Sequence, residues 1–145
     1  SSFAREAYAP ATGVVLAAYV LAEPEGEELD VVLMSSGSEV AFILAAHQRL
    51  AAEAIRSRVV SMPSHELFAR QREAYRASVL PPDVPRVAIE AAHPMSWYRW
   101  VGDNGVVLGL ERFGASAPYE RIYEELGLTV DKVVDAAMQL VGSRR

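Results

Sequence analysis

The 145-residue sequence contains no cysteine, and 13 of its 14 basic residues are arginine. The lack of cysteine excludes a disulfide framework, a thiolate zinc site and a redox-active thiol, and it fits a reducing compartment. The formal net charge is −5, and no basic run exceeds the pair Arg144 and Arg145. Binding to phosphates requires clustered cations, so the sequence argues against nucleic acid as a partner.

Long hydrophobic runs are also lacking. The longest one, residues 14–22, has nine residues, whereas a helix needs about 20 to span a bilayer. No basic segment precedes it, so it is not typical of a signal peptide. We therefore expect a protein of the cytoplasm with no membrane partner. Residues 1–12 are predicted to be a linker or tail from an upstream domain, and residues 13–145 are predicted to be one domain.

Short β-branched segments alternate with segments that have helical periodicity. Strands are expected at 14–21, 31–34, 58–62, 86–90 and 106–110. Helices are expected from a capping box at Ser36–Glu39 to about residue 53, then at 64–80, 96–101, 118–126 and 129–141. This order predicts an α/β layer fold with a mainly parallel sheet and helices on both faces.

Polar side chains follow four of the expected strands, in loops at 35–39, 62–65, 90–94 and 111–116. Parallel strands bring these loops to one edge of the sheet, which is where open α/β sheets bind ligands. The sequence predicts a small-anion or effector site there, formed by Ser36, Ser38, Glu39, His65, His93 and Arg112, with Glu90 nearby. The alternative is that Ser36 and Glu39 only cap a helix and that the other groups are solvated.

The remaining candidates indicate structural roles. His47 lies on an apolar stripe and is expected to be partly buried and hydrogen-bonded, whereas His65 is expected at the surface and His93 is the best functional candidate. Gln71 is expected to satisfy a buried backbone group. The histidine spacings match no metal motif, and no nucleophile elbow or glycine-rich phosphate loop is present. The cluster at residues 97–100 is more typical of a protein interface or internal packing than of base stacking.

Several segments resemble the C-terminal domain of transketolases. They are SSGSEV (35–40), MPSHELFARQ (62–71), YRASVLP (75–81), WY (97–98) before Gly102, FGASAP (113–118) and LGLTV (126–130). These segments occur in the family's order and cover about residues 14–141. Two alternatives stay open, a free-standing effector-binding regulatory module and the same domain of another thiamine enzyme, such as 1-deoxyxylulose-5-phosphate synthase or a 2-oxo acid dehydrogenase β subunit. The SVLP and FGASAP stretches favour transketolase.

The resemblance implies a three-layer α/β/α unit with a five-stranded mixed sheet whose first strand is antiparallel. It implies a dimeric parent enzyme of the pentose phosphate pathway, which transfers a ketol unit between sugar phosphates with thiamine diphosphate and a divalent cation, Mg²⁺ or Ca²⁺. In that family the cofactor and substrate lie between the two other domains. No catalytic, cofactor-binding or metal residue is therefore assigned here, and residues 102–104 are interpreted as a turn.

The same resemblance predicts what this chain does alone. We expect it to be inactive and to act structurally, by contacting the upstream domains and supporting a homodimer. Its apolar helices and the pair Trp97 and Trp100 are the residues expected to make those contacts.

Overall fold

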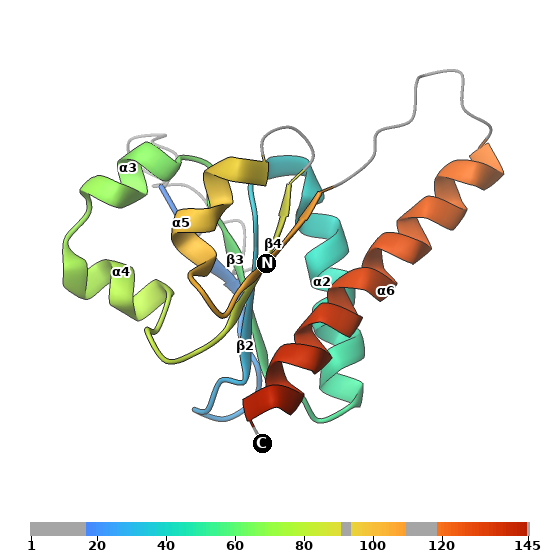
Figure 1. Cartoon of the computed structure of the whole chain (residues 1–145), viewed down its shortest axis with the longest axis horizontal. Helices are drawn as coiled ribbons and strands as arrows, with labels where there is room; N and C mark the ends of the chain where they lie inside the picture. Colours follow the sequence, from blue (N-terminus) through green and yellow to red (C-terminus); the bar gives the residue numbers. More distant parts are fainter. Residues whose placement is uncertain (1–16, 91–93, 110–118, 145) are drawn as a thin grey trace.

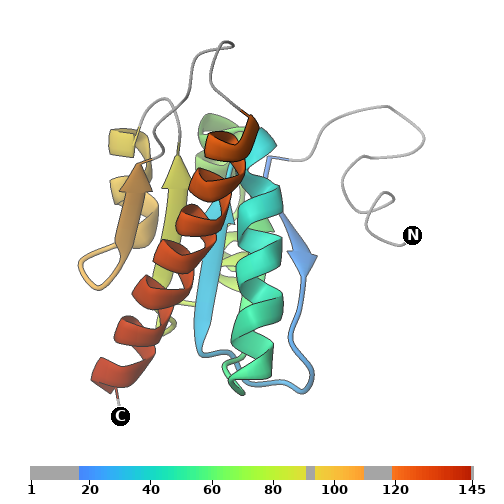
Figure 2. The same ribbon diagram turned by 90° about the vertical axis from the view of Figure 1, so that its right-hand side faces the viewer.

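The computed structural model describes residues 17–90, 94–109 and 119–144, with the side chains of Ser38 and residues 119–128 left out. Its centre is a five-stranded sheet in the order β1-β3-β2-β4-β5. The strands are β1 (Tyr19–Ala22), β2 (Val31–Ser35), β3 (Ser57–Ser61), β4 (Arg86–Glu90) and β5 (Val106–Gly109). β1 pairs antiparallel with β3, and the other pairs are parallel. The predicted mixed, mainly parallel sheet is confirmed (Figure 2).

Helices cover both faces of the sheet, as predicted (Figures 1 and 2). One face carries α2 (Val40–Ala52) and the long α6 (Tyr119–Arg144). The other face carries α3 (His65–Arg70), α4 (Glu73–Val79), the 3-10 turn η2 (Pro94–Trp97) and α5 (Tyr98–Val101). Ser64 begins α3 by accepting a hydrogen bond from the backbone N–H of Leu67, so this predicted cap is confirmed.

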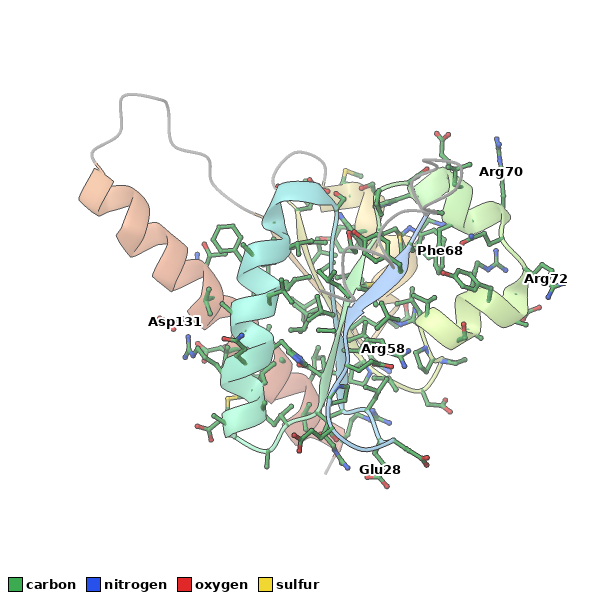
Figure 3. All side chains as sticks on the ribbon, turned by 180° about the vertical axis from the view of Figure 1, so that it is seen from behind. Glu28, Arg58, Phe68, Arg70, Arg72 and Asp131 are labelled. Carbon is green, nitrogen blue, oxygen red and sulfur yellow. The ribbon has the colours of Figure 1, made fainter. Side chains whose placement is uncertain are left out.

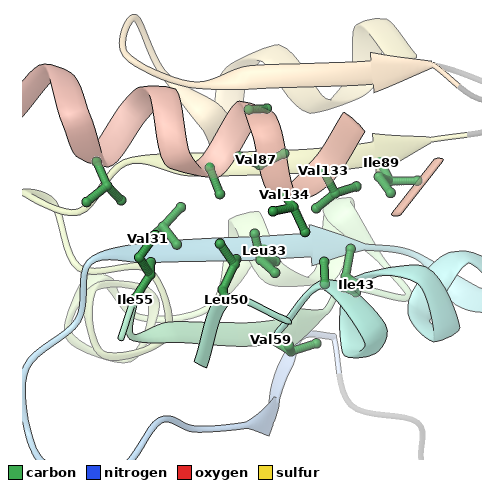
Figure 4. Packing of buried hydrophobic residues seen from close by; sticks show 14 of the residues in the cluster. Val31, Leu33, Ile43, Leu50, Ile55, Val59, Val87, Ile89, Val133 and Val134 are labelled. Carbon is green, nitrogen blue, oxygen red and sulfur yellow. The ribbon is translucent and has the colours of Figure 1, made fainter. Parts of the chain in front are cut away.

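The two helical layers enclose different cores. Between the sheet and α2/α6 the buried residues are mostly branched aliphatic ones, including Leu33, Ile43, Leu50 and Val133 (Figure 4). Between the sheet and α3–α5 they include Met34, Met62, Phe68, Trp97 and Trp100. The central strand β2 is buried along its whole length, which explains its uninterrupted apolar sequence.

Four local expectations were wrong. The capping box at Ser36–Glu39 does not form, because a 3-10 turn η1 (Gly37–Glu39) precedes α2 and Ser36 makes no side-chain cap. Gly37 has φ +74°, a conformation that glycine adopts without strain. The helix expected at 64–80 divides into α3 and α4 around an extended Gln71 and Arg72. The helices expected at 118–126 and 129–141 form one continuous α6.

The fourth error concerns the first strand, which begins at Tyr19 rather than at Val14. Ala17 and Ala18 lie in a bend, and residues 14–16 are outside the described part of the chain. The predicted linker at 1–12 also falls outside it, so the boundary between linker and domain stays a prediction.

The end of α2 has a specific hydrogen-bond pattern. The N–H of Ile55 donates to the carbonyl of Leu50 at 2.9 Å, and the N–H of Ala54 donates to that of Ala51 at 3.0 Å. This is a Schellman motif, whose turning residue normally is glycine. Here the residue is Ala54, at φ +58°, and the buried side chains of Ile55 and Leu50 belong to the same core cluster.

Candidate functional site

The carboxyl ends of β2, β3 and β4 lie level with one another. Ser35 is in register with Ser61 on one side and with Ile89 on the other. Ser36 and His65, which follow β2 and β3, and Glu90, which ends β4, therefore lie at one edge of the sheet. The structure thus brings together those predicted site residues that it describes. His93 and Arg112 lie outside the described residues, and the side chain of Ser38 is not described.

Glu90 organises this edge. Its side chain is buried, and its Oε1 atom accepts hydrogen bonds from the Ser36 hydroxyl at 3.1 Å and from the Trp97 indole N–H at 2.8 Å. The Ser36 hydroxyl therefore donates its hydrogen bond to a carboxylate 54 residues away and does not form the helix cap that its spacing suggested. A buried carboxylate with two donors joins the loops after β2 and β4.

His65, expected at the surface, is half-buried at the same edge. Its ring stands edge-on to Trp97, with the ring centroids 4.3 Å apart, and lies 6.3 Å from that of Trp100. Burial lowers the pKa of His65, and this effect outweighs the hydrogen bond with the backbone of Ser96 and the charge of Glu90, both of which favour the imidazolium. The lowered pKa favours the neutral imidazole, which packs against Trp97 as an aromatic ring.

The chemistry of the edge follows from these contacts. Glu39 is buried there as well as Glu90, so two carboxylic side chains stand where an anion was predicted. The Ser36 hydroxyl donates to the Glu90 carboxylate and the His65 ring packs on Trp97, so these contacts do not form a Ser-His-carboxylate triad. The described residues hold the loops together, and the anion or effector site stays a prediction.

At the opposite edge of the sheet, a groove of about 1000 Å³ runs between the loop before β4, the turn after α5 and the end of α6. Arg86 is half-buried in its wall and donates to the carbonyls of Trp100 at 2.6 Å, Leu80 at 3.1 Å and Pro81 at 3.2 Å. Burial lowers the pKa of Arg86. Sequence reasoning missed this role, although an arginine opening an apolar strand was the available signal.

His47 behaves as expected. Its Nδ1 lies 2.7 Å from the Ser57 hydroxyl, and burial lowers its pKa, while Ser57 and the charge of Glu23 act in the opposite sense. These residues line a second cavity of about 690 Å³ below α2. Ser57 is only 1% exposed, so its hydroxyl is not open to a substrate in that cavity.

The aromatic cluster and the neighbouring polar residues resolve further expectations. Trp97 and Trp100 are buried inside the domain, so the interpretation as internal packing is confirmed and they do not themselves present a surface to another domain. Residues 103–104 form the expected turn, with Gly102 at φ +71°. The side-chain oxygen of Gln71 is buried and accepts no hydrogen bond within the described part of the chain, so a role of Gln71 toward a buried backbone group stays a prediction.

Two searches of the described residues complete the survey of the site. Among the side chains that the structure describes, no three of histidine, aspartate or glutamate lie close enough to share a metal ion. None of the helices in the described ranges is both long enough and apolar enough to cross a bilayer.

Comparison with known proteins gives a consistent result. Residues 17–129 match the family described as the transketolase-like TK C-terminal domain. Transketolase 1 of Escherichia coli K12 is 47% identical over 124 residues, which are 85% of this chain and 19% of that protein. The transketolase of Rhodobacter capsulatus is 48% identical over 130 residues, which are 86% of this chain and 19% of that protein. The chain thus spans about a fifth of these relatives.

Solved structures agree. The transketolase from Leishmania mexicana superposes with a TM-score of 0.71 at 38% identity, over 88% of this chain and 18% of that one. A split-gene transketolase, an inactive beta4 tetramer, superposes with a TM-score of 0.59 at 25% identity, over 97% of this chain and 47% of that one. These similarities do not favour a regulatory module or another thiamine enzyme. The mixed sheet between two helical layers and the match over residues 17–129 show that this chain belongs to the transketolase-like C-terminal domain family.

Proposed function

We propose that this chain is the C-terminal domain of a complete transketolase, in which its own role is structural. The observation that carries the proposal is the similarity along the chain, 47% identity over 85% of it to a protein of which it spans 19%. The parent enzyme would transfer a two-carbon ketol unit between sugar phosphates in the pentose phosphate pathway. Transketolase structures from Pichia stipitis are complexes with sedoheptulose-7-phosphate, xylulose-5-phosphate and fructose-6-phosphate, which supports this substrate class.

The residues of this chain do not fit the cofactor that the family implies. Thiamine diphosphate supplies the carbanion chemistry when it is bound, and a divalent cation holding its diphosphate needs oxygen ligands free to coordinate it. At the carboxyl edge, Glu90 Oε1 already accepts two hydrogen bonds from within the domain. We therefore assign the cofactor and its Mg²⁺ or Ca²⁺ to the upstream domains and derive no catalytic step from this chain.

The remaining parts of the proposal concern assembly and location. We propose that the complete protein is a cytoplasmic homodimer and that this domain supports it through contacts with the upstream domains. The split-gene transketolase supports the proposed inactivity of this chain on its own, because that protein is an inactive beta4 tetramer and this chain matches 47% of its chain. A larger piece that contains this domain type can thus assemble without activity.

The test compares the 145-residue chain with the full-length polypeptide of the gene that encodes it. We expect the full-length protein to transfer a ketol unit between sugar phosphates when thiamine diphosphate and Mg²⁺ are supplied, and the chain alone to show no transfer. Calorimetric titration of the chain alone with thiamine diphosphate and Mg²⁺ is expected to give no heat. Micromolar binding by the chain, or a full-length protein without ketol transfer, would overturn the proposal.

A further inference from the structure

Large apolar side chains that face solvent gather on one side of this domain. Among the described residues, those exposed by more than a third are Leu67 (50%), Tyr75 (37%), Met95 (83%), Tyr98 (60%) and Met138 (40%). The first four lie on α3, α4, η2 and α5, which form one layer. Only Met138 belongs to α6, on the opposite face.

The exposed residues of η2 and α5 stand on a firmly held segment. Trp97, Trp100 and Val101 point into the core and are 0%, 8% and 5% exposed, and Trp97 is tied to Glu90. Met95 and Tyr98 come from the same segment, η2 and α5, and are 83% and 60% exposed. Because the backbone beneath them is anchored, placing these side chains in an interface costs little conformational entropy.

A cation completes this surface. The Arg99 guanidinium lies 4.5 Å from the ring centroid of Trp100, which orients it by a cation–π contact. α3 borders the segment, because His65 in its first turn contacts Trp97, and two residues further along α3 exposes Leu67. We name Leu67, Met95, Tyr98 and Arg99 the docking face. Methionine, tyrosine and arginine are the residue types enriched in protein interfaces.

The outer surface of the opposite layer differs. On α6, Asp131, Lys132 and Asp135 are exposed, and Asp131 forms an ion pair with Arg49 of α2. Among the described side chains of α6, the exposed ones are polar or charged except for Met138. The docking face, by contrast, exposes the side chains of Leu67, Met95 and Tyr98 by 50%, 83% and 60%.

We infer that the docking face packs against the upstream domains of the same transketolase polypeptide. This inference rests on the proposed function, and it adds which surface makes the contact. The size of the relatives identifies the occupant, since this chain spans 19% of them and about four fifths of each lies outside it. The two tryptophans expected to make this contact instead support it from below.

Hydroxyl-radical oxidation tests the inference on the isolated chain and on the full-length polypeptide. Methionine and aromatic side chains are oxidised according to their exposure. We expect Met95 and Tyr98 to be oxidised several-fold more slowly in the full-length protein, and Met138 at a similar rate in both. Equal rates for Met95 and Tyr98 in the two proteins, or slower oxidation of Met138 in their place, would overturn the inference. So would protection of Met95 that grows with the concentration of the isolated chain, which would identify a second copy as the occupant.

A variant sharpens the test. Tyr98→Asp in the full-length protein places a charge in the contact and is expected to weaken docking roughly tenfold or more, so Met95 should be oxidised at the rate of the isolated chain. Met138→Asp is the matched control and should leave Met95 protected; if it exposes Met95 as Tyr98→Asp does, the inference fails. The urea midpoint of isolated Tyr98→Asp should equal that of the wild type, which shows that the domain still folds.

The two proposals fail separately. A full-length protein that transfers a ketol unit but leaves Met95 as exposed as in the isolated chain would retain the proposed function and refute the docking face. A full-length protein without ketol transfer would refute the proposed function, and the oxidation rates would still decide the docking face.

Discussion

The two helical layers of this domain hold to the sheet by different means. The layer of α2 and α6 is made of two long helices over an aliphatic core (Figure 4). The layer of α3, α4, η2 and α5 is made of short helices over a core rich in aromatic and sulfur-containing side chains. Helices this short are not stable by themselves, so other contacts have to hold them.

Those contacts are hydrogen bonds from a few long side chains. Tyr75 donates to the carbonyl of Ala18 at 2.8 Å, Arg86 donates to three carbonyls around α4 and α5, and Trp97 donates to Glu90. Figure 3 shows Phe68 pointing inward from α3, while Arg70 and Arg72 project outward at its end. The comparison teaches that one layer depends on the area of its apolar contact, and the other on single anchoring residues.

The largest effect is expected when one anchor is removed. Trp97→Ala should lower the free energy of unfolding by about 3–5 kcal/mol, because it creates a large cavity and also removes a donor to Glu90. Urea unfolding of the isolated chain measures the loss. Leu50→Ala in the aliphatic layer is the matched variant, for which about 2–5 kcal/mol is expected. If Trp97→Ala costs less than Leu50→Ala, the anchoring role of Trp97 is refuted.

A smaller effect is expected from the polar half of that anchor. Glu90→Leu leaves the buried Trp97 N–H without an acceptor, which should cost about 1–3 kcal/mol. Trp97→Phe removes the donor and most of the need for the acceptor, so the double variant should lose less than the sum of the single ones. Urea unfolding of the four proteins gives the coupling free energy. Strict additivity would show that the hydrogen bond contributes nothing.

The smallest effect concerns pH. Burial lowers the pKa of both His47, in the aliphatic layer, and His65, in the aromatic layer, below the ordinary value of 6.5. Near pH 6.5 the unfolded chain therefore binds more protons at these histidines than the folded chain does. The contribution of these histidines to the free energy of unfolding should be fully present above about pH 6.5, the ordinary histidine pKa. It should be lost as the pH is lowered through the folded pKa values.

The urea midpoint between pH 7.5 and 5.5 measures this effect in the wild type and in the variants His47→Gln and His65→Gln. Each variant should remove part of the slope, since glutamine does not titrate. An unchanged slope in His65→Gln would show that the aromatic layer does not resist protonation of this residue.

Much of the fold was predictable because its strands and helices have strong patterns. The apolar run of β2 and the helical spacing of α2 were sufficient to place both elements. The predictions failed where a long-range contact outweighs a local signal. Ser36 had the spacing of a helix cap, but Glu90 offers its hydroxyl a buried acceptor. Gly127 and Thr129 indicated a break, yet α6 continues through them.

The end of α2 shows a second kind of limit. A glycine at residue 54 would have predicted a Schellman turn, but the sequence has an alanine there, which adopts the left-handed conformation. The Schellman hydrogen bonds and the burial of Ile55 outweigh its steric cost, which is about 1–2 kcal/mol for a non-glycine residue. For the site, the sequence predicted which edge of the sheet carries the polar loops. It could not predict that Glu90 accepts hydrogen bonds from both Ser36 and Trp97.

Ser36 and Trp97 both donate a hydrogen bond to the same oxygen atom of Glu90. α2 lies on one side of the sheet and η2 on the other. The Oε1 atom of Glu90 therefore links the loop before α2 to η2 across the end of the sheet. A contact that displaces η2 at Met95 or Tyr98 would strain the hydrogen bond from Trp97 to Glu90. Because Ser36 donates to the same oxygen, that displacement would also affect the loop before α2. A displacement of one helical layer would in this way shift the other layer.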